Sequence, residues 1–259
     1  MLFIISAIAL LAVSANLLAP FIPFSAEKKL AAAFEKQMAA EGPHIEDSDL
    51  SRYLQSLAER LAEAQQLPED MSITVHYIND DTVNAFATLG GHVFFFRGLL
   101  ESVPNENALA MVMAHEIAHV KHRHPIKSLG RAVIIGTATA VVSSAVGGDI
   151  VSDVLGKTGL LTVLKFSREQ EEQSDETALA AIARLYGHVG GSSTLFNVLK
   201  EAHKHETQAP EFFNSHPLTD NRLQNIAAMA KEQGWQLTGP LTPLPTDFSR
   251  WLQQNREAQ

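Results

Sequence analysis

The spacing of apolar residues predicts two helices near the start of the chain. Residues 26–40 are rich in alanine and other strong helix formers, and Gly42-Pro43 end the segment. A second helix is predicted from Ser48 up to the residues before Pro68, because its leucines recur every three or four positions and so share one face. These leucines are Leu50, Leu54, Leu57 and Leu61.

Two short segments that follow have the pattern of β-strands. Residues 71–78 (MSITVHYI) alternate and are rich in β-branched side chains, and residues 92–96 (HVFFF) combine valine with aromatic bulk. Gly90-Gly91 marks a turn or bulge before the second strand. From Asn105 onward the pattern is almost wholly helical, and several prolines predict an irregular tail over residues 239–259. The expected fold class is α+β, mainly α, with a small β-sheet.

The first 24 residues, MLFIISAIALLAVSANLLAPFIPF, carry no charged side chain. About 20 apolar residues span a bilayer as a helix, so an uncleaved membrane anchor is the favoured interpretation. A cleaved signal peptide is the alternative, because Val13 and Ala15 suit a cleavage site, although no Lys or Arg precedes the apolar run. A buried core helix is a third interpretation. Lys28 and Lys29 favour a cytoplasmic flank only weakly, since a glutamate accompanies them.

A second apolar stretch occupies residues 132–165. Its first predicted helix, residues 132–148, has about 15 apolar or small residues, which is short for a bilayer span. We expect a buried or membrane-grazing helical insertion, with a transmembrane hairpin as the alternative. The expected organisation is an N-terminal anchor or signal segment over residues 1–24, one domain over residues 25–238 that contains the insertion, and the tail.

Composition narrows the possible chemistry. The chain of 259 residues has a formal net charge of -9 and no concentrated basic stripe, so nucleic acid is not an expected partner. It has no cysteine, which excludes disulfides, cysteine metal sites and thiol nucleophiles. Any metal site must therefore use histidine and carboxylate ligands.

The segment MVMAHEIAHVKHRH, residues 111–124, carries such ligands on a predicted helix. His115 and His119 are one helical turn apart on the same face, so both imidazoles can bind one ion. Glu116 projects to the side, where it can take a proton from a water that the ion holds. This H-E-x-x-H pattern is typical of zinc metallopeptidases. The rival interpretation is a polar cluster at a helix end, but burial beside apolar residues favours a bound cation.

Two further histidines in this segment are not expected to bind the ion. His122 lies about 10.5 Å along the helix axis from His115, which is too far for a shared metal. His124 points to the opposite face and precedes Pro125, where the helix should break. Both are expected to be structural or solvated.

A third ligand is expected from the acidic helix that begins after Ser167. Glu171 and Asp175 are four residues apart on one face, so the glutamate can bind metal while the aspartate orients a ligand histidine. Other acids share the helix start, where the helix dipole favours them without any chemistry. Spacing alone leaves the choice between Glu171 and these neighbours open.

Four motifs in order resemble those of the membrane-associated zinc gluzincins. The motifs are NAFATLGGHVFFFRGLL, NENALAMVMAHEIAHVKHRH, FSREQEEQSDETA and NSHPLTDNRL, within about residues 70 to 230. The family includes the CAAX prenyl proteases, the heat-shock protease HtpX, the mitochondrial inner-membrane protease OMA and bacterial periplasmic relatives. The resemblance implies a gluzincin metallopeptidase fold and one Zn²⁺ per chain.

The resemblance also assigns roles to individual residues. It implies that His115, His119 and Glu171 bind zinc, that Glu116 is the general base and that Asp175 supports a ligand histidine without touching the ion. Glu171 occupies the glutamate position of the family's S-R-x-x-E-x-x-A-D pattern, in which Ser174 replaces the usual alanine.

Two residues of the last motif are further catalytic candidates. His216 matches the histidine of the family's His-Pro motif, and the resemblance implies a switch that fills zinc's open position in a resting state. Arg222 matches the arginine that follows, and the resemblance implies that it stabilises the oxyanion of the reaction. The alternatives are that His216 packs a loop and that Arg222 pairs with an acid.

The resemblance also implies that residues 91–96 form an edge strand above the zinc. Its segment Gly91, His92, Val93 and Phe94 would then pair with extended substrate by β-augmentation. Without the resemblance, HVFFF would be a core strand.

The sequence thus predicts a zinc-dependent endopeptidase that cleaves misfolded or membrane-associated proteins at the bacterial cell envelope. The expected location is the inner membrane, with the N-terminal segment as anchor and the catalytic domain in the periplasm. The rival from another class is a zinc-stabilised chaperone or binding module with little proteolysis.

Overall fold

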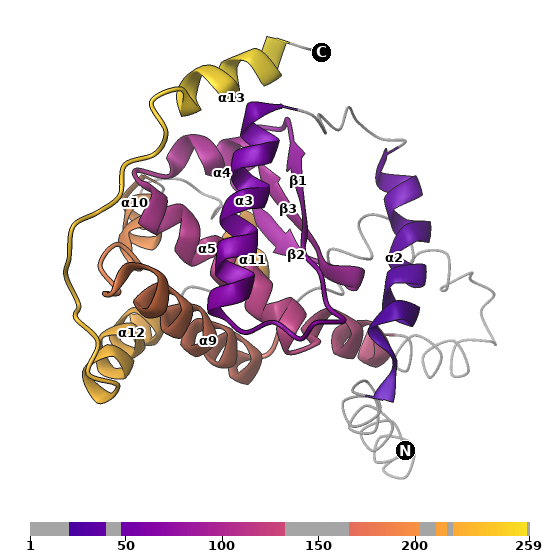
Figure 1. The fold of residues 1–259 in the computed structure, drawn as a ribbon, viewed down its shortest axis with the longest axis horizontal. Coiled ribbons are helices and arrows are strands. Elements are labelled where there is room, and N and C mark those ends of the chain that lie inside the picture. The colour runs from indigo at the N-terminus through magenta and orange to yellow at the C-terminus, as the bar shows by residue number, and fades with distance from the viewer. Residues whose placement is uncertain (1–20, 40–47, 133–165, 203–210, 217–219, 258–259) are drawn as a thin grey trace, which may run out of the picture.

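The computed structural model describes residues 21–39, 48–132, 166–202, 211–216 and 220–257, and these ranges carry the fold (Figure 1). Nearly all of the predicted anchor or signal segment and of the predicted insertion lies outside them. No helix within the described ranges is long and apolar enough to cross a membrane. The named elements, in chain order, are α2 (Phe24–Ala39), α3 (Asp49–Ala64), β1 (Thr74–Ile78), β2 (Ala85–Ala87), η2 (Leu89–Gly91), β3 (His92–Phe96), α4 (Arg97–Ser102), α5 (Glu106–Lys121), α9 (Arg168–Tyr186), α10 (Thr194–Ala202), α11 (Glu211–Ser215), α12 (Asp220–Glu232) and α13 (Phe248–Glu257).

This mainly helical architecture with one small sheet confirms the predicted fold class. The helix predicted from Ser48 is α3, and the Ser48 side chain caps it by accepting from the N–H of Ser51. The four leucines of its apolar face are all buried. They pack against α5 and against one face of the sheet, and α3 crosses in front of the strands in Figure 1.

The sheet has three strands in the order β1-β3-β2. β1 is parallel to β3 along all five residues, and β2 is antiparallel to β3 through Ala85–Phe95, Phe86–Phe94 and Ala87–Val93. β3 is therefore the central strand, and the expectation that residues 91–96 form an edge strand is wrong. The reason is that the turn at η2 folds β3 back against β2 while β1 pairs along its other side.

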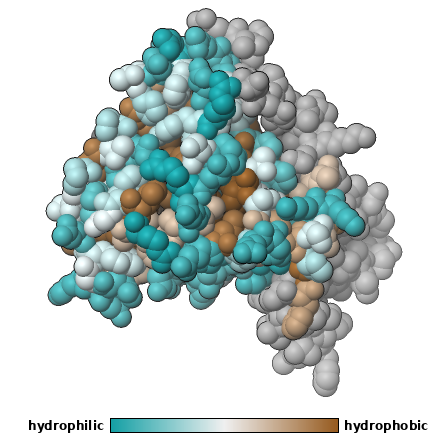
Figure 2. All heavy atoms as spheres, viewed as in Figure 1, coloured by the Kyte–Doolittle hydropathy of each residue, from teal (hydrophilic) through white to brown (hydrophobic). Residues whose placement is uncertain are grey.

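Helix α5 lies at the centre of the core. Every residue from Glu106 to Val120 is buried, because α3, α9 and the sheet surround the helix. The face shown in Figure 2 is largely hydrophilic, with a cluster of apolar side chains in its middle and smaller apolar patches toward its margins. Polar groups on α5 are therefore removed from water and need partners inside the protein.

The C-terminal region is an extended strap followed by a helix. The strap runs along the outside of the molecule from α12 to α13 (Figure 1), and Thr242 fastens it to the start of α5. Its carbonyl accepts from the N–H of Glu106 at 3.0 Å, and its N–H donates to Oδ1 of Asn107 at 2.7 Å. The prediction of an irregular tail is wrong for residues 248–257, which form α13 because Phe248 and Trp251 pack against Tyr53.

We expect Gly91→Ala to destabilise the fold far more than Gly234→Ala. Both glycines have positive φ, which costs another residue about 1–2 kcal/mol. A Cβ on Gly91 would also lie 1.9 Å from the carbonyl oxygen of Ser72, whereas a Cβ on Gly234 would meet nothing within 4 Å. Chemical denaturation of both variants checks this, and equal losses of unfolding free energy would contradict the close packing at the turn.

Candidate metal centre

Two histidines of α5 form the base of the site. Asn105 caps the helix by accepting from the N–H of Ala108, which fixes where its turns fall. His115 and His119 lie one turn apart, and their Nε2 atoms are 3.0 Å from each other. Both side chains are buried. The ring of Phe166 stacks on His119 at 3.9 Å and keeps water from that side.

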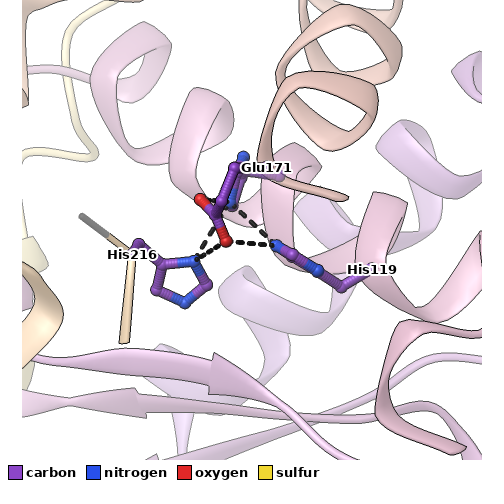
Figure 3. Close-up of side chains that lie close together, drawn as sticks. His119, Glu171 and His216 are labelled. Carbon is purple, nitrogen blue, oxygen red and sulfur yellow. Dashed lines mark hydrogen bonds and ion pairs between the residues drawn. The ribbon is translucent and has the colours of Figure 1, made fainter. Parts of the chain in front are cut away.

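Helix α9 brings Glu171 onto these two rings. A capping box formed by Ser167 and Gln170 starts this helix, so Glu171 stands in its first turn. Its Oε2 lies 3.4 Å from Nε2 of His115, and its Oε1 lies 3.5 Å from Nε2 of His119. Figure 3 shows the carboxylate between the rings of His119 and His216.

His216, the residue that follows α11, completes the cluster. Its Nδ1 lies 3.2 Å from Nε2 of His115 and 3.1 Å from Oε1 of Glu171. Phe212 positions it: the backbone N–H of His216 donates to the carbonyl of Phe212, and the two rings stack. The N–H of Phe212 in turn donates to the carbonyl of Val83, just before β2.

The four side chains fit a single metal ion. His115, His119, Glu171 and His216 each offer one ligand atom, and these atoms all lie within 4.8 Å of one another. In five of the six pairs of these side chains, the nearest ligand atoms lie 3.0 to 3.5 Å apart. Ligands about 2.0–2.1 Å from a tetrahedral zinc are about 3.3–3.4 Å apart. Three imidazole nitrogens and one carboxylate oxygen form a ligand set that zinc accepts.

The electrostatics of the cluster also favour a cation. Burial lowers the pKa of His115, but Asp175 and Glu171 outweigh this and raise it to about 10. Burial raises the pKa of Glu171, but His216 and His115 outweigh this and hold it well below the usual value. Burial and the neighbouring His115 lower the pKa of His119 well below its usual value. The carboxylates of Asp175 and Glu171 thus stabilise a positive charge at this buried site, either a proton on His115 or a bound cation, and His119 stays neutral, which is the form that binds metal.

Glu116 stands beside this cluster and is fully buried. Its Oε2 accepts from the backbone N–H of Ala87 in β2 at 2.8 Å, and its Oε1 lies 3.3 Å from Nε2 of His216. Burial raises its pKa, although His216 and His115 counteract part of this effect. A carboxylate with a raised pKa is a better proton acceptor, as a general base requires.

Asp175 was expected to orient a ligand histidine, and it contacts His115. Its Oδ1 is 2.9 Å from Nδ1 of His115, on the side of the ring that faces away from the cluster. A carboxylate in this position holds the imidazole so that Nε2 points at the ion.

The remaining predictions concern Arg222 and the strand expected to bind substrate. Arg222 belongs to α12, and its side chain lies outside the described residues. The segment Gly91, His92, Val93 and Phe94 lies in the turn and the central strand. The strand that contacts the site is β2, through Ala87.

His124 is a residue of the site that sequence reasoning missed. It is buried, as the structural alternative of the prediction implied, but its Nδ1 also lies 2.9 Å from Nδ1 of His119, which was not expected. A continuous helix would carry it to the opposite face. Helix α5 ends at Lys121, however, and Arg123 adopts a left-handed φ of 60°, which turns the chain back. Only the proline at 125 hinted at this break. His122 instead contacts Oγ1 of Thr177 at 2.7 Å.

Comparison with known proteins agrees with this geometry. The model of peptidase family M48 matches residues 48–230. The putative beta-barrel assembly-enhancing protease of Vibrio cholerae is 26% identical over 211 residues, which are 77% of this chain and 43% of that protein. The beta-barrel assembly-enhancing protease of Escherichia coli K12 is 26% identical over 221 residues, which are 80% of this chain and 44% of the relative. The mitochondrial metalloendopeptidase OMA1 of Schizosaccharomyces pombe is 30% identical over 205 residues, 77% of this chain and 60% of that protein. The chain thus spans less than half the length of the two bacterial relatives.

We predict that metal binding stabilises the protein. Zn²⁺ added to chelator-treated protein at a hundred times its Kd should raise the free energy of unfolding by about 2.7 kcal/mol. Glu171→Gln should reduce this gain strongly, while Glu172→Gln, at an exposed neighbour, should leave it unchanged. Denaturation with and without Zn²⁺ measures the effect. An equal gain in both variants would exclude Glu171 as a ligand.

Proposed function

We propose that this chain, which belongs to peptidase family M48, is a zinc-dependent endopeptidase. Family membership and the named metalloendopeptidase relatives identify the domain as a metallopeptidase domain. The observation that carries the more specific proposal is the set of four buried ligand atoms within 4.8 Å, with the buried carboxylate of Glu116 beside it. His115, His119 and Glu171 would hold the ion.

The residues around the site support hydrolysis by an activated water. When bound, zinc acidifies a water molecule and polarises the substrate carbonyl. Glu116 accepts the proton of that water at Oε1, because the N–H of Ala87 already holds Oε2. Asp175 keeps His115 oriented throughout.

The position of His216 in the cluster supports a resting state in which this side chain closes the metal site. Its Nδ1 would fill the fourth ligand position of a bound ion, and its Nε2 lies 3.3 Å from Oε1 of Glu116. Catalytic zinc needs its fourth position for water, so His216 must leave before hydrolysis can occur. Arg222 lies six residues further along, in α12, and is proposed to stabilise the oxyanion once substrate is bound.

Strand β2 is the edge that an extended substrate would reach. Its partner β3 lies on one side only, and the N–H of Ala87 on the other side points to Glu116. The carbonyl of Val83 on the same side is occupied by the N–H of Phe212. Movement of α11 would therefore free both the fourth ligand position and part of the substrate edge.

The proposed substrates are unfolded or membrane-associated proteins at the bacterial cell envelope. The names of the bacterial relatives refer to β-barrel assembly, and the yeast relative is mitochondrial. The apolar sequence over residues 1–24 supports anchoring in the inner membrane. The periplasm is the proposed location of the catalytic domain because the bacterial relatives are named for β-barrel assembly. Quality control of envelope proteins is the corresponding biological role. A zinc-stabilised chaperone or binding module is the second candidate.

Glu116→Gln separates the two candidates. The variant should retain zinc, since Glu116 is not a proposed ligand, but it should cleave casein about 100-fold more slowly or worse. Metal analysis and a casein cleavage assay on wild type and variant measure both properties. Cleavage at the wild-type rate would contradict the base role and favour the chaperone.

His216→Ala tests the closed resting state. Because the fourth ligand position opens, cleavage of an unfolded protein should rise several-fold when zinc is saturating. His122→Ala is the matched control, as this histidine contacts Thr177 rather than the cluster. Unchanged or lower activity of His216→Ala with zinc retained would contradict autoinhibition.

A further inference from the structure

A chain of three polar side chains leads away from His119 on the side opposite the metal cluster. In Figure 3 the imidazole of His119 presents one nitrogen to Glu171, and the other points away. That second nitrogen, Nδ1, lies 2.9 Å from Nδ1 of His124. Nε2 of His124 lies 3.1 Å from Oε1 of Gln173, and Oγ of Ser174 stands 3.4 Å from Nδ1 of His124.

The chemistry of these groups fixes where the protons are. The side-chain carbonyl oxygen of Gln173 can only accept, so Nε2 of His124 must carry the proton of that hydrogen bond. A neutral imidazole has one N–H, which leaves Nδ1 of His124 as an acceptor. Nδ1 of His119 must therefore be the donor between the two rings. Nε2 of His119 is then without a proton, and its lone pair points into the cluster.

We propose that His124 and Gln173 are positioning residues that set the tautomer of His119 and thereby its affinity for the metal. The inference rests on the proposed metal site. It assigns a role to a histidine that touches neither the ion's expected position nor Glu116. The opposite tautomer of His119 would place a proton where the metal must bind.

Helix α9 thereby supports both histidines of α5, but in two different ways. Asp175 contacts Nδ1 of His115 directly and adds a negative charge. Gln173, two residues earlier, reaches His119 only through His124 and adds no charge. The left-handed turn at Arg123 brings His124 between His119 and Gln173.

The test is the affinity for Zn²⁺ alone, measured by competition with a chromophoric chelator. Loss of a group that orients a ligand histidine costs about 10–100-fold in metal affinity. His124→Leu should show such a loss, and His124→Asn should recover part of it, because Oδ1 of asparagine can accept near the position of Nδ1. If His124 only packed against its neighbours, the hydrogen-bond acceptor of asparagine would give no recovery of Zn²⁺ affinity over leucine.

Gln173 gives an independent test because its side chain is exposed and its replacement leaves the core intact. Gln173→Leu should weaken Zn²⁺ binding, whereas Gln173→Glu, which keeps an acceptor, should bind as tightly as wild type or more tightly. His122→Leu and Glu172→Gln are matched controls, because His122 contacts Thr177 and Glu172 is exposed, and both should leave the affinity unchanged. This pair of Gln173 variants decides the question if His124→Leu does not fold.

Two outcomes would overturn the proposal. One is a His124→Leu variant that folds and binds Zn²⁺ within about twofold of wild type, where a 10-fold loss is expected. The other is equal weakening in Gln173→Leu and Gln173→Glu. Failure of the wild-type protein to bind Zn²⁺ would instead overturn the proposed metal site, so the two failures are distinguishable.

Discussion

The burial of ionisable groups in the middle of α5 is the constraint on which the rest of the structure depends. His115, Glu116 and His119 lie in a helix whose every residue from Glu106 to Val120 is buried. Charged groups in such a place are costly unless other charges or hydrogen bonds compensate them. A divalent cation shared by two histidines and Glu171 would supply that compensation, and its binding would then be coupled to folding.

Each element around α5 meets a part of this demand. Helix α9 brings Glu171 and Asp175 to the two sides of His115. Strand β2 contributes the N–H that holds Glu116. The residue after α11 closes the cluster with His216. Helix α11 is short, and a backbone hydrogen bond from Phe212 to Val83 ties it to the start of β2. Breaking this bond would let α11 move and carry His216 out of the cluster, which would open the site.

Much of this arrangement could be predicted from local patterns. Helical spacing placed His115, His119 and Glu116 correctly on α5, and the leucine pattern gave α3 with its Ser48 cap. The order of the strands could not be predicted from local patterns. β3 was expected at the edge of the sheet, but it is central because it also pairs with β1, and no pattern within β3 shows that pairing. His124 was missed because one left-handed residue, Arg123, breaks the helical periodicity. Helix α13 was missed because contacts with Tyr53, rather than its own sequence, hold it in place.

The measurement that tests the central claim most directly is X-ray diffraction at the zinc absorption edge from crystals of the wild-type protein grown with Zn²⁺. The proposed site should give one strong anomalous peak, bonded to His115, His119 and Glu171, with His216 as the fourth ligand in the absence of substrate. Ligand distances should be about 2.0–2.2 Å. A peak bonded to other residues, or no peak at this cluster in crystals that hold zinc elsewhere, would contradict it.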